Sequence, residues 1–81
     1  FSCPVCGEPA QLLPKVGDRL DVDSPGVGGR YAISGTAEAM WPTSITEPQR
    51  TFLKEWIAEK HREGDACPVI HSGILKEATA K

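Results

Sequence analysis

The feature that most constrains this chain is its first turn, Cys3-Pro4-Val5-Cys6-Gly7. Two cysteines separated by two residues, with proline inside the turn and glycine after it, form the tight loop that directs both sulfurs to one metal ion. Zinc is the ion we expect in such a loop. Because a structural zinc site is tetrahedral, this knuckle supplies half of the ligands. Two more must come from the rest of the chain.

The candidates for the other two ligands are Cys67 and His71. Together with Cys3 and Cys6 they predict a site of three sulfurs and one nitrogen, with Cys-x2-Cys and Cys-x3-His spacing. His61 is a competing nitrogen ligand. Four protein ligands close a zinc site to water, so we expect a structural site. The alternative is that Cys67 is a small buried apolar residue and that His71 lies at the surface.

A metal would help a chain of this size to fold. At 81 residues it is expected to be a single domain, residues 1–81, close to the lower limit for a hydrophobic core alone. A structural zinc contributes on the order of 10 kcal/mol in small domains, which is comparable with the whole stability of a typical fold.

The middle of the chain predicts a β-hairpin. Residues 19–23 and 30–34 alternate polar and apolar side chains, as half-buried strands do. The segment between them, Ser24-Pro25-Gly26-Val27-Gly28-Gly29, is rich in turn-forming residues. Residues 8–14 contain two prolines and indicate a loop or an edge strand.

The clearest helix is predicted over residues 47–63. Thr46 is a candidate N-cap with Gln49 as its capping-box partner, and Gly64 ends the helix. Its apolar face consists of Phe52, Leu53, Trp56 and Ile57.

Two shorter helices complete the predicted α+β fold. The first covers residues 35–41, with Ser34 or Thr36 near its start, and the second covers 73–80 with Ser72 as its cap. Residues 67–71 are predicted to be extended.

Taken together, these motifs resemble a largely uncharacterised family of bacterial zinc-ribbon-like domains. The resemblance rests on Cys-Pro-x-Cys-Gly, the hairpin and Tyr31-x-Ile33-Ser34, and continues through Leu53, Trp56-Ile57, Gly64 and Pro68-Val69-Ile70. It implies a small zinc-stabilised domain that is often fused to other modules. The second knuckle of that family reads Cys-Pro-x-Cys-Gly-x-Tyr, but Ser24 and Val27 stand here in place of its cysteines. Either the metal is lost, or its missing ligands are Cys67 and His71.

Charge argues against general nucleic-acid binding. The formal net charge is −2 and no long run of Lys or Arg occurs. A weaker alternative is a nucleic-acid-binding hairpin, since zinc ribbons use such hairpins and the cations Lys15, Arg19 and Arg30 lie on or near this one. The neighbouring carboxylates, expected to be solvated at the strand edge, oppose it: Asp18, Asp21 and Asp23.

A thiol redox protein is the other alternative, because Cys-Pro-x-Cys is also the form of a redox site. In such sites the first cysteine begins a helix, whereas Gly7 and Pro9 follow here and no strand precedes. Gly26, Gly28 and Gly29 lack the spacing of a phosphate-binding loop, and no hydrolase motif is present. We therefore expect no enzymatic activity.

The predicted function is a non-enzymatic, zinc-stabilised interaction module, an accessory domain of a larger bacterial protein that binds a protein partner or a neighbouring domain. Three cysteines, an odd number, indicate a reducing compartment, and the cytoplasm is the simplest choice. No apolar run approaches the roughly 18 residues of a membrane span, and residues 1–2 before Cys3 carry no signal-peptide pattern. A chain that begins at Phe1 is expected to be a processed protein or a piece of a longer one.

Overall fold

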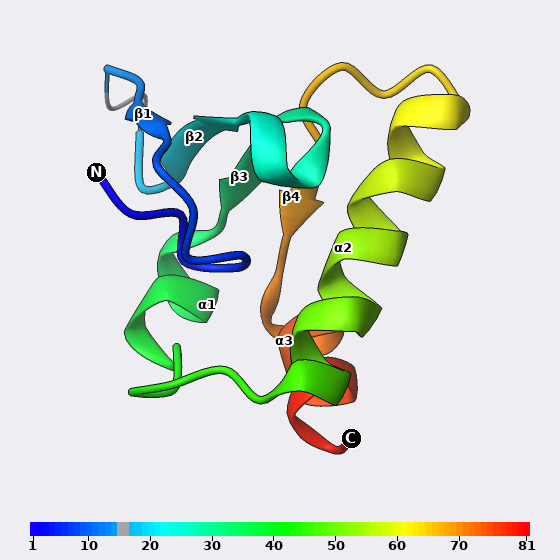
Figure 1. Cartoon of the computed structure of the whole chain (residues 1–81). Helices are drawn as coiled ribbons and strands as arrows, with labels where there is room; N and C mark the ends of the chain where they lie inside the picture. The colour runs from blue at the N-terminus through cyan, green and yellow to red at the C-terminus, as the bar shows by residue number, and fades with distance from the viewer. Residues whose placement is uncertain (15–16) are drawn as a thin grey trace.

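A four-stranded sheet in the order β1-β2-β3-β4 forms the centre of the fold (Figure 1). The computed structural model describes residues 1–14 and 17–81. Strands β1 (Gln11–Leu12), β2 (Leu20–Ser24) and β3 (Gly29–Ile33) run antiparallel to one another in sequence order. Strand β4 (Val69–Ile70) pairs parallel with β3. The α+β class and the hairpin predicted from the sequence are thus confirmed, and of the two alternatives for residues 8–14, a loop or an edge strand, the structure has a short edge strand.

The hairpin turn is tight because of its composition. A single 3₁₀ turn, η1 (Pro25–Val27), follows β2, and the Gly28 amide donates to the Pro25 carbonyl at 3.1 Å. Gly28 and Gly29 then adopt φ values of 91° and 134°, which side-chain-bearing residues rarely take. The turn is two residues shorter than predicted, because Ser24 and Gly29 still pair with each other in the ladder.

The pleat of the sheet separates two sets of side chains, because alternate residues of a strand point to opposite faces. From the strand register, one face carries the apolar residues and Ser24, while the other carries charged residues together with Ala32 and Val69. On the charged face Asp21 is only 7% exposed and pairs with Arg19 at 2.8 Å. The prediction that Asp21 is solvated at a strand edge was therefore wrong, since the Arg19 guanidinium takes the place of water.

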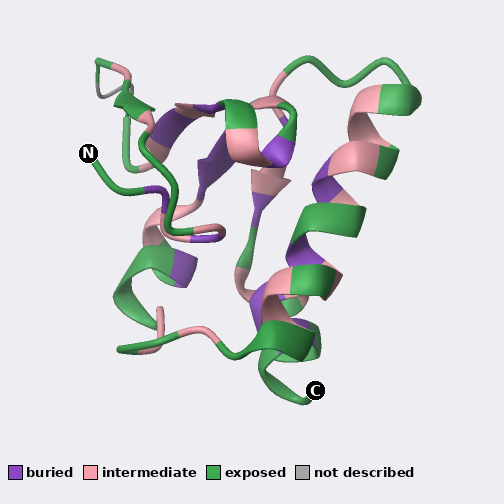
Figure 2. Ribbon diagram, in the orientation of Figure 1, coloured by how far each residue is buried: buried purple, intermediate pink, exposed green. Residues whose placement is uncertain are grey.

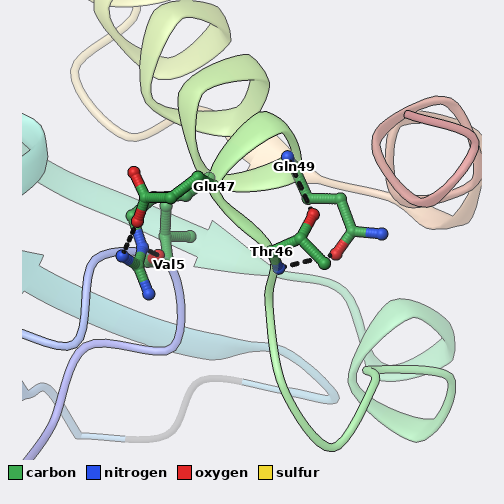
Figure 3. A network of polar contacts seen from close by, with 5 residues as sticks. Val5, Thr46, Glu47 and Gln49 are labelled. Atoms are coloured by element: carbon green, nitrogen blue, oxygen red, sulfur yellow. Dashed lines mark hydrogen bonds and ion pairs between the residues drawn. The ribbon is translucent and has the colours of Figure 1, made fainter.

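Three helices pack with the sheet: α1 (Gly35–Ala39), α2 (Glu47–Arg62) and α3 (Ser72–Thr79). The Ser34 hydroxyl accepts from the Ala37 amide at 3.2 Å and caps α1. Thr46 and Gln49 form the predicted capping box at the start of α2 (Figure 3). The cap of α3 differs from the prediction: it is His71 rather than Ser72.

The core lies between the apolar face of the sheet and the helices (Figure 2). Helix α2 contributes Leu53 and Ile57, both fully buried, while Phe52 and Trp56 pack at its edge. Burial of each such aliphatic side chain stabilises the fold by about 1.5–3 kcal/mol. The knuckle joins the same core through Cys3 and Val5, and α3 joins it through Leu75 and Ala78. Of the helices in the described part of the chain, none combines the length and the apolarity needed to cross a bilayer.

Candidate functional site

The Cys3–Cys6 knuckle is a closed loop that the N-terminal turns of α2 hold in place. The Cys3 amide donates to the Glu8 carbonyl at 2.9 Å and the Gly7 amide to the Cys3 carbonyl at 2.8 Å. The Arg50 Nε donates to the Val5 carbonyl at 3.1 Å, and Arg50 also pairs with Glu47 (Figure 3). The position of the knuckle is therefore set by backbone hydrogen bonds, by burial of Val5 and by one arginine.

Each sulfur of the knuckle contacts a hydroxyl group from the hairpin. The Cys3 Sγ lies 3.1 Å from the Tyr31 Oη of β3, and the Cys6 Sγ lies 3.5 Å from the Ser24 Oγ at the end of β2. The Cys6 amide also donates to the Cys3 Sγ at 3.5 Å. We refer to Cys3, Cys6, Ser24 and Tyr31 as the thiol cluster.

The thiol cluster favours a negative charge on Cys3. Burial disfavours the thiolate, but hydrogen bonds from Ser24, from Tyr31 and from the amide and thiol of Cys6 outweigh burial and lower the pKa of Cys3. Burial, followed by the hydrogen bond and the charge of Cys3, raises the pKa of Tyr31 far above its usual value. The Tyr31 hydroxyl thus stays protonated, and it donates its hydrogen bond to the Cys3 sulfur when Cys3 is a thiolate.

The hairpin turn, where the sequence resemblance placed a second pair of cysteines replaced here by Ser24 and Val27, lies against the knuckle. The Ser24 Oγ lies 3.5 Å from the Cys6 Sγ, and a Cβ atom added to Gly26 would lie only 2.6 Å from the same sulfur. Val27 is 5% exposed and belongs to the hydrophobic core. The knuckle and the hairpin turn thus supply two sulfurs, the Ser24 hydroxyl and the hydrocarbon side chain of Val27. These groups are not the donor set of a closed four-ligand zinc site.

The other predicted ligands lie elsewhere. Cys67 is half-buried on the charged face, where burial and then the Asp21 carboxylate raise its pKa. The His71 Nδ1 accepts from the Gly73 amide at 3.1 Å as the cap of α3. His61, the competing ligand, bonds through Nε2 to the Arg30 carbonyl at 2.7 Å.

The predicted zinc ligands Cys3, Cys6, Cys67 and His71 therefore do not form one group. Among residues 1–14 and 17–81, no three His, Cys, Asp or Glu side chains gather where they could hold a metal ion. All three cysteines are free thiols. The structure brings Cys3 and Cys6 together in the knuckle. Cys67 lies among charged groups instead, and His71 caps α3.

The cations proposed for nucleic-acid binding do not form a free basic patch. Arg19 is paired with Asp21, and Arg30 is exposed beside its ladder neighbour Asp23. Lys15 lies outside the described residues. Carboxylates accompany both described arginines, which weakens the attraction for phosphate.

A groove of about 490 Å³ opens beside Cys6. Its walls come from the knuckle, the hairpin turn and the start of α2, and its lining residues are Cys6, Glu8, Pro9, Pro25, Gly26, Glu47, Arg50 and Lys54. Cys6 is partly exposed, whereas Cys3 is 3% exposed. Of the two thiols, Cys6 is therefore the one that a molecule in the groove can reach.

Sequence reasoning did not assign Ser24 and Tyr31 as partners of the sulfurs. The alternation of β3 places Tyr31 on the same face as Ile33, and Ser24 occupies a position that the ribbon pattern reserves for a ligand. Both signals were present in the sequence, but only the fold brings the two hydroxyls to the knuckle.

A scan against protein-family models, a search of curated proteins and a search of solved structures each find no match for this chain.

Proposed function

We propose that this domain is a non-enzymatic interaction module that takes an extended segment of a protein partner, or of a neighbouring domain, into the groove beside Cys6. The observation that carries the proposal is the way in which three separate segments, the knuckle, the hairpin turn and helix α2, converge to form the groove. Concave sites with a few fixed polar groups are typical binding sites.

The groove is held in shape before any partner arrives. Arg50 spans from Glu47 to the Val5 carbonyl and so fixes one wall, while Gly26 allows the turn to approach Cys6 closely. A pre-organised site loses less conformational entropy on binding.

Two exposed charges of opposite sign, Glu8 and Lys54, complete the lining. Within the described part of the chain, neither of them takes part in an ion pair. They would pair with opposite charges on the bound segment and set its orientation.

Zinc, a larger bacterial parent protein and a cytoplasmic location remain predictions from the sequence. The thiol cluster offers zinc two sulfurs, so a metal there would need further ligands from outside the cluster.

The test is peptide selection followed by charge reversal. Peptides are selected from a random displayed library on the wild-type domain and are then measured against the double variant Glu8→Lys/Lys54→Glu. We expect a loss of binding on the order of tenfold or more, because each ion pair becomes a like-charge contact. The matched control, Glu55→Lys/Lys76→Glu, changes exposed charges outside the groove lining. Peptides that bind both double variants as well as they bind the wild type would contradict the proposal.

A further inference from the structure

We propose that Cys3 and Cys6 form a dithiol–disulfide pair that exchanges with low-molecular-weight thiols and disulfides, with Cys6 as the entry sulfur and Cys3 as the buried, resolving sulfur. This activity goes beyond the interaction proposed above and does not depend on it.

The first support is proximity. The two cysteines belong to one closed turn, in which the Cys6 amide donates to the Cys3 Sγ at 3.5 Å and the Gly7 amide donates to the Cys3 carbonyl at 2.8 Å. Cysteines three residues apart in a turn can be joined by a disulfide through local adjustment of the turn, so distant parts of the chain need not move. Cys67 lies on the other face of the sheet and has no comparable partner thiol among the described residues.

The second support is the difference in access. Cys6 borders the groove, whereas Cys3 is 3% exposed and packs in the core. A disulfide RSSR can therefore reach the Cys6 sulfur alone. Because exchange depends on which sulfur can be attacked, the fold fixes the order of the two steps.

In the oxidising direction Cys6, after loss of its proton to solvent, attacks one sulfur of RSSR. The S–S bond breaks, RS⁻ leaves and takes up a proton, and a mixed disulfide forms on Cys6. The Cys3 thiolate then attacks the Cys6 sulfur and expels the second RS⁻. The protein loses two electrons and two protons in forming its disulfide, and RSSR is reduced to two RSH.

The third support is the set of donors around Cys3. In the reverse direction RS⁻ attacks Cys6 and Cys3 leaves as a thiolate. The Tyr31 hydroxyl at 3.1 Å, the Ser24 hydroxyl and the Cys6 amide all stabilise that leaving group. A stabilised thiolate makes the disulfide easier to reduce, so the pair is expected to cycle rather than to form a permanent crosslink.

The test uses the full chain in the Cys67→Ala background, equilibrated in buffers of reduced and oxidised glutathione and read by mass spectrometry after alkylation. We expect a two-electron transition to an intramolecular disulfide. Tyr31→Phe should raise the equilibrium constant for disulfide formation on the order of tenfold, which corresponds to a midpoint about 30 mV more negative. Ser24→Ala should shift the midpoint in the same direction and serves as a second variant. The unfolded chain in denaturant should also form its disulfide more readily than the folded chain.

Trapping tests the order of the sulfurs. With Cys3→Ser, glutathione should accumulate as a mixed disulfide on Cys6, whereas folded Cys6→Ser should remain unmodified at Cys3. Circular dichroism confirms that each variant is folded. Absence of an intramolecular disulfide, an unchanged midpoint in both folded hydroxyl variants, or faster glutathione capture by Cys3 than by Cys6 would overturn the proposal.

Discussion

Replacement of Ser24 by cysteine should convert the thiol cluster into a zinc site. The Ser24 Oγ lies 3.5 Å from the Cys6 Sγ, and the Cys3 Sγ lies 3.5 Å from the Cys6 amide within the same knuckle. Two sulfurs on a tetrahedral zinc are about 3.8 Å apart, given a Zn–S distance of about 2.3 Å. A sulfur at position 24 would add a third thiol beside the two of the knuckle, at a distance from the Cys6 sulfur close to that found in zinc sites.

The size of the effect follows from linkage. Zinc at about one hundred times its dissociation constant stabilises the folded state by about 2.7 kcal/mol. In a domain of this size each kcal/mol moves the melting temperature by roughly 4–8 °C, so zinc should raise it by roughly 10–20 °C. Without zinc the variant should be slightly less stable than the wild type, because Ser24 is fully buried and sulfur is larger than oxygen.

Thermal unfolding in the presence of zinc or a chelator measures this shift, and competition with a chromophoric chelator measures the affinity. Ala80→Cys is the control, because it adds the same thiol at an exposed position at the end of α3. A folded Ser24→Cys protein with no zinc-dependent shift would refute the placement of Ser24 beside the Cys3–Cys6 knuckle. Equal shifts in the wild type and in Ser24→Cys would refute the two-sulfur description of the cluster.

Three further changes probe the surroundings of the site and the core. Gly26→Ala should cost about 1–3 kcal/mol in urea unfolding, because its Cβ would lie 2.6 Å from the Cys6 Sγ and displace that side chain; an unchanged midpoint would contradict the close approach. Leu53→Ala should cost about 2–5 kcal/mol and Phe52→Ala less, since only Leu53 is fully buried; equal losses would count against this helix orientation. Cys67 should be alkylated with a pH midpoint above that of the unfolded chain, because burial raises its pKa and leaves less thiolate at a given pH; a lower midpoint would be inconsistent with this environment.

The parts of the fold that depend on neighbouring residues were predictable from the sequence. The hairpin follows from alternating strands around a glycine-rich turn, and α2 follows from the capping box of Thr46 and Gln49 and from the spacing of its apolar face. Each of these signals depends on residues close together in the chain, so it can be recognised in the sequence without knowledge of the fold.

The parts that depend on distant residues were not predictable. The parallel pairing of β4 with β3 joins segments that are far apart in the chain. Strand β4 has only two residues, which is too short for its sequence pattern to specify the register of that pairing. The expected ligands Cys67 and His71 do not join the knuckle, because Cys67 lies before β4 among charged groups that include Asp21 and Arg19, and because His71 caps α3. Spacing alone identified both residues as ligands, but it could not indicate these competing roles.

The most direct test of the thiol cluster is the alkylation rate of each cysteine in the folded, reduced protein, measured with and without a zinc chelator. The structure predicts that Cys6 reacts quickly in both conditions, because it borders the groove, and that Cys3 is protected in both, because it is buried. Protection of both thiols that disappears when the chelator is added would contradict the account, since it would mean that a metal with a closed ligand set holds the knuckle.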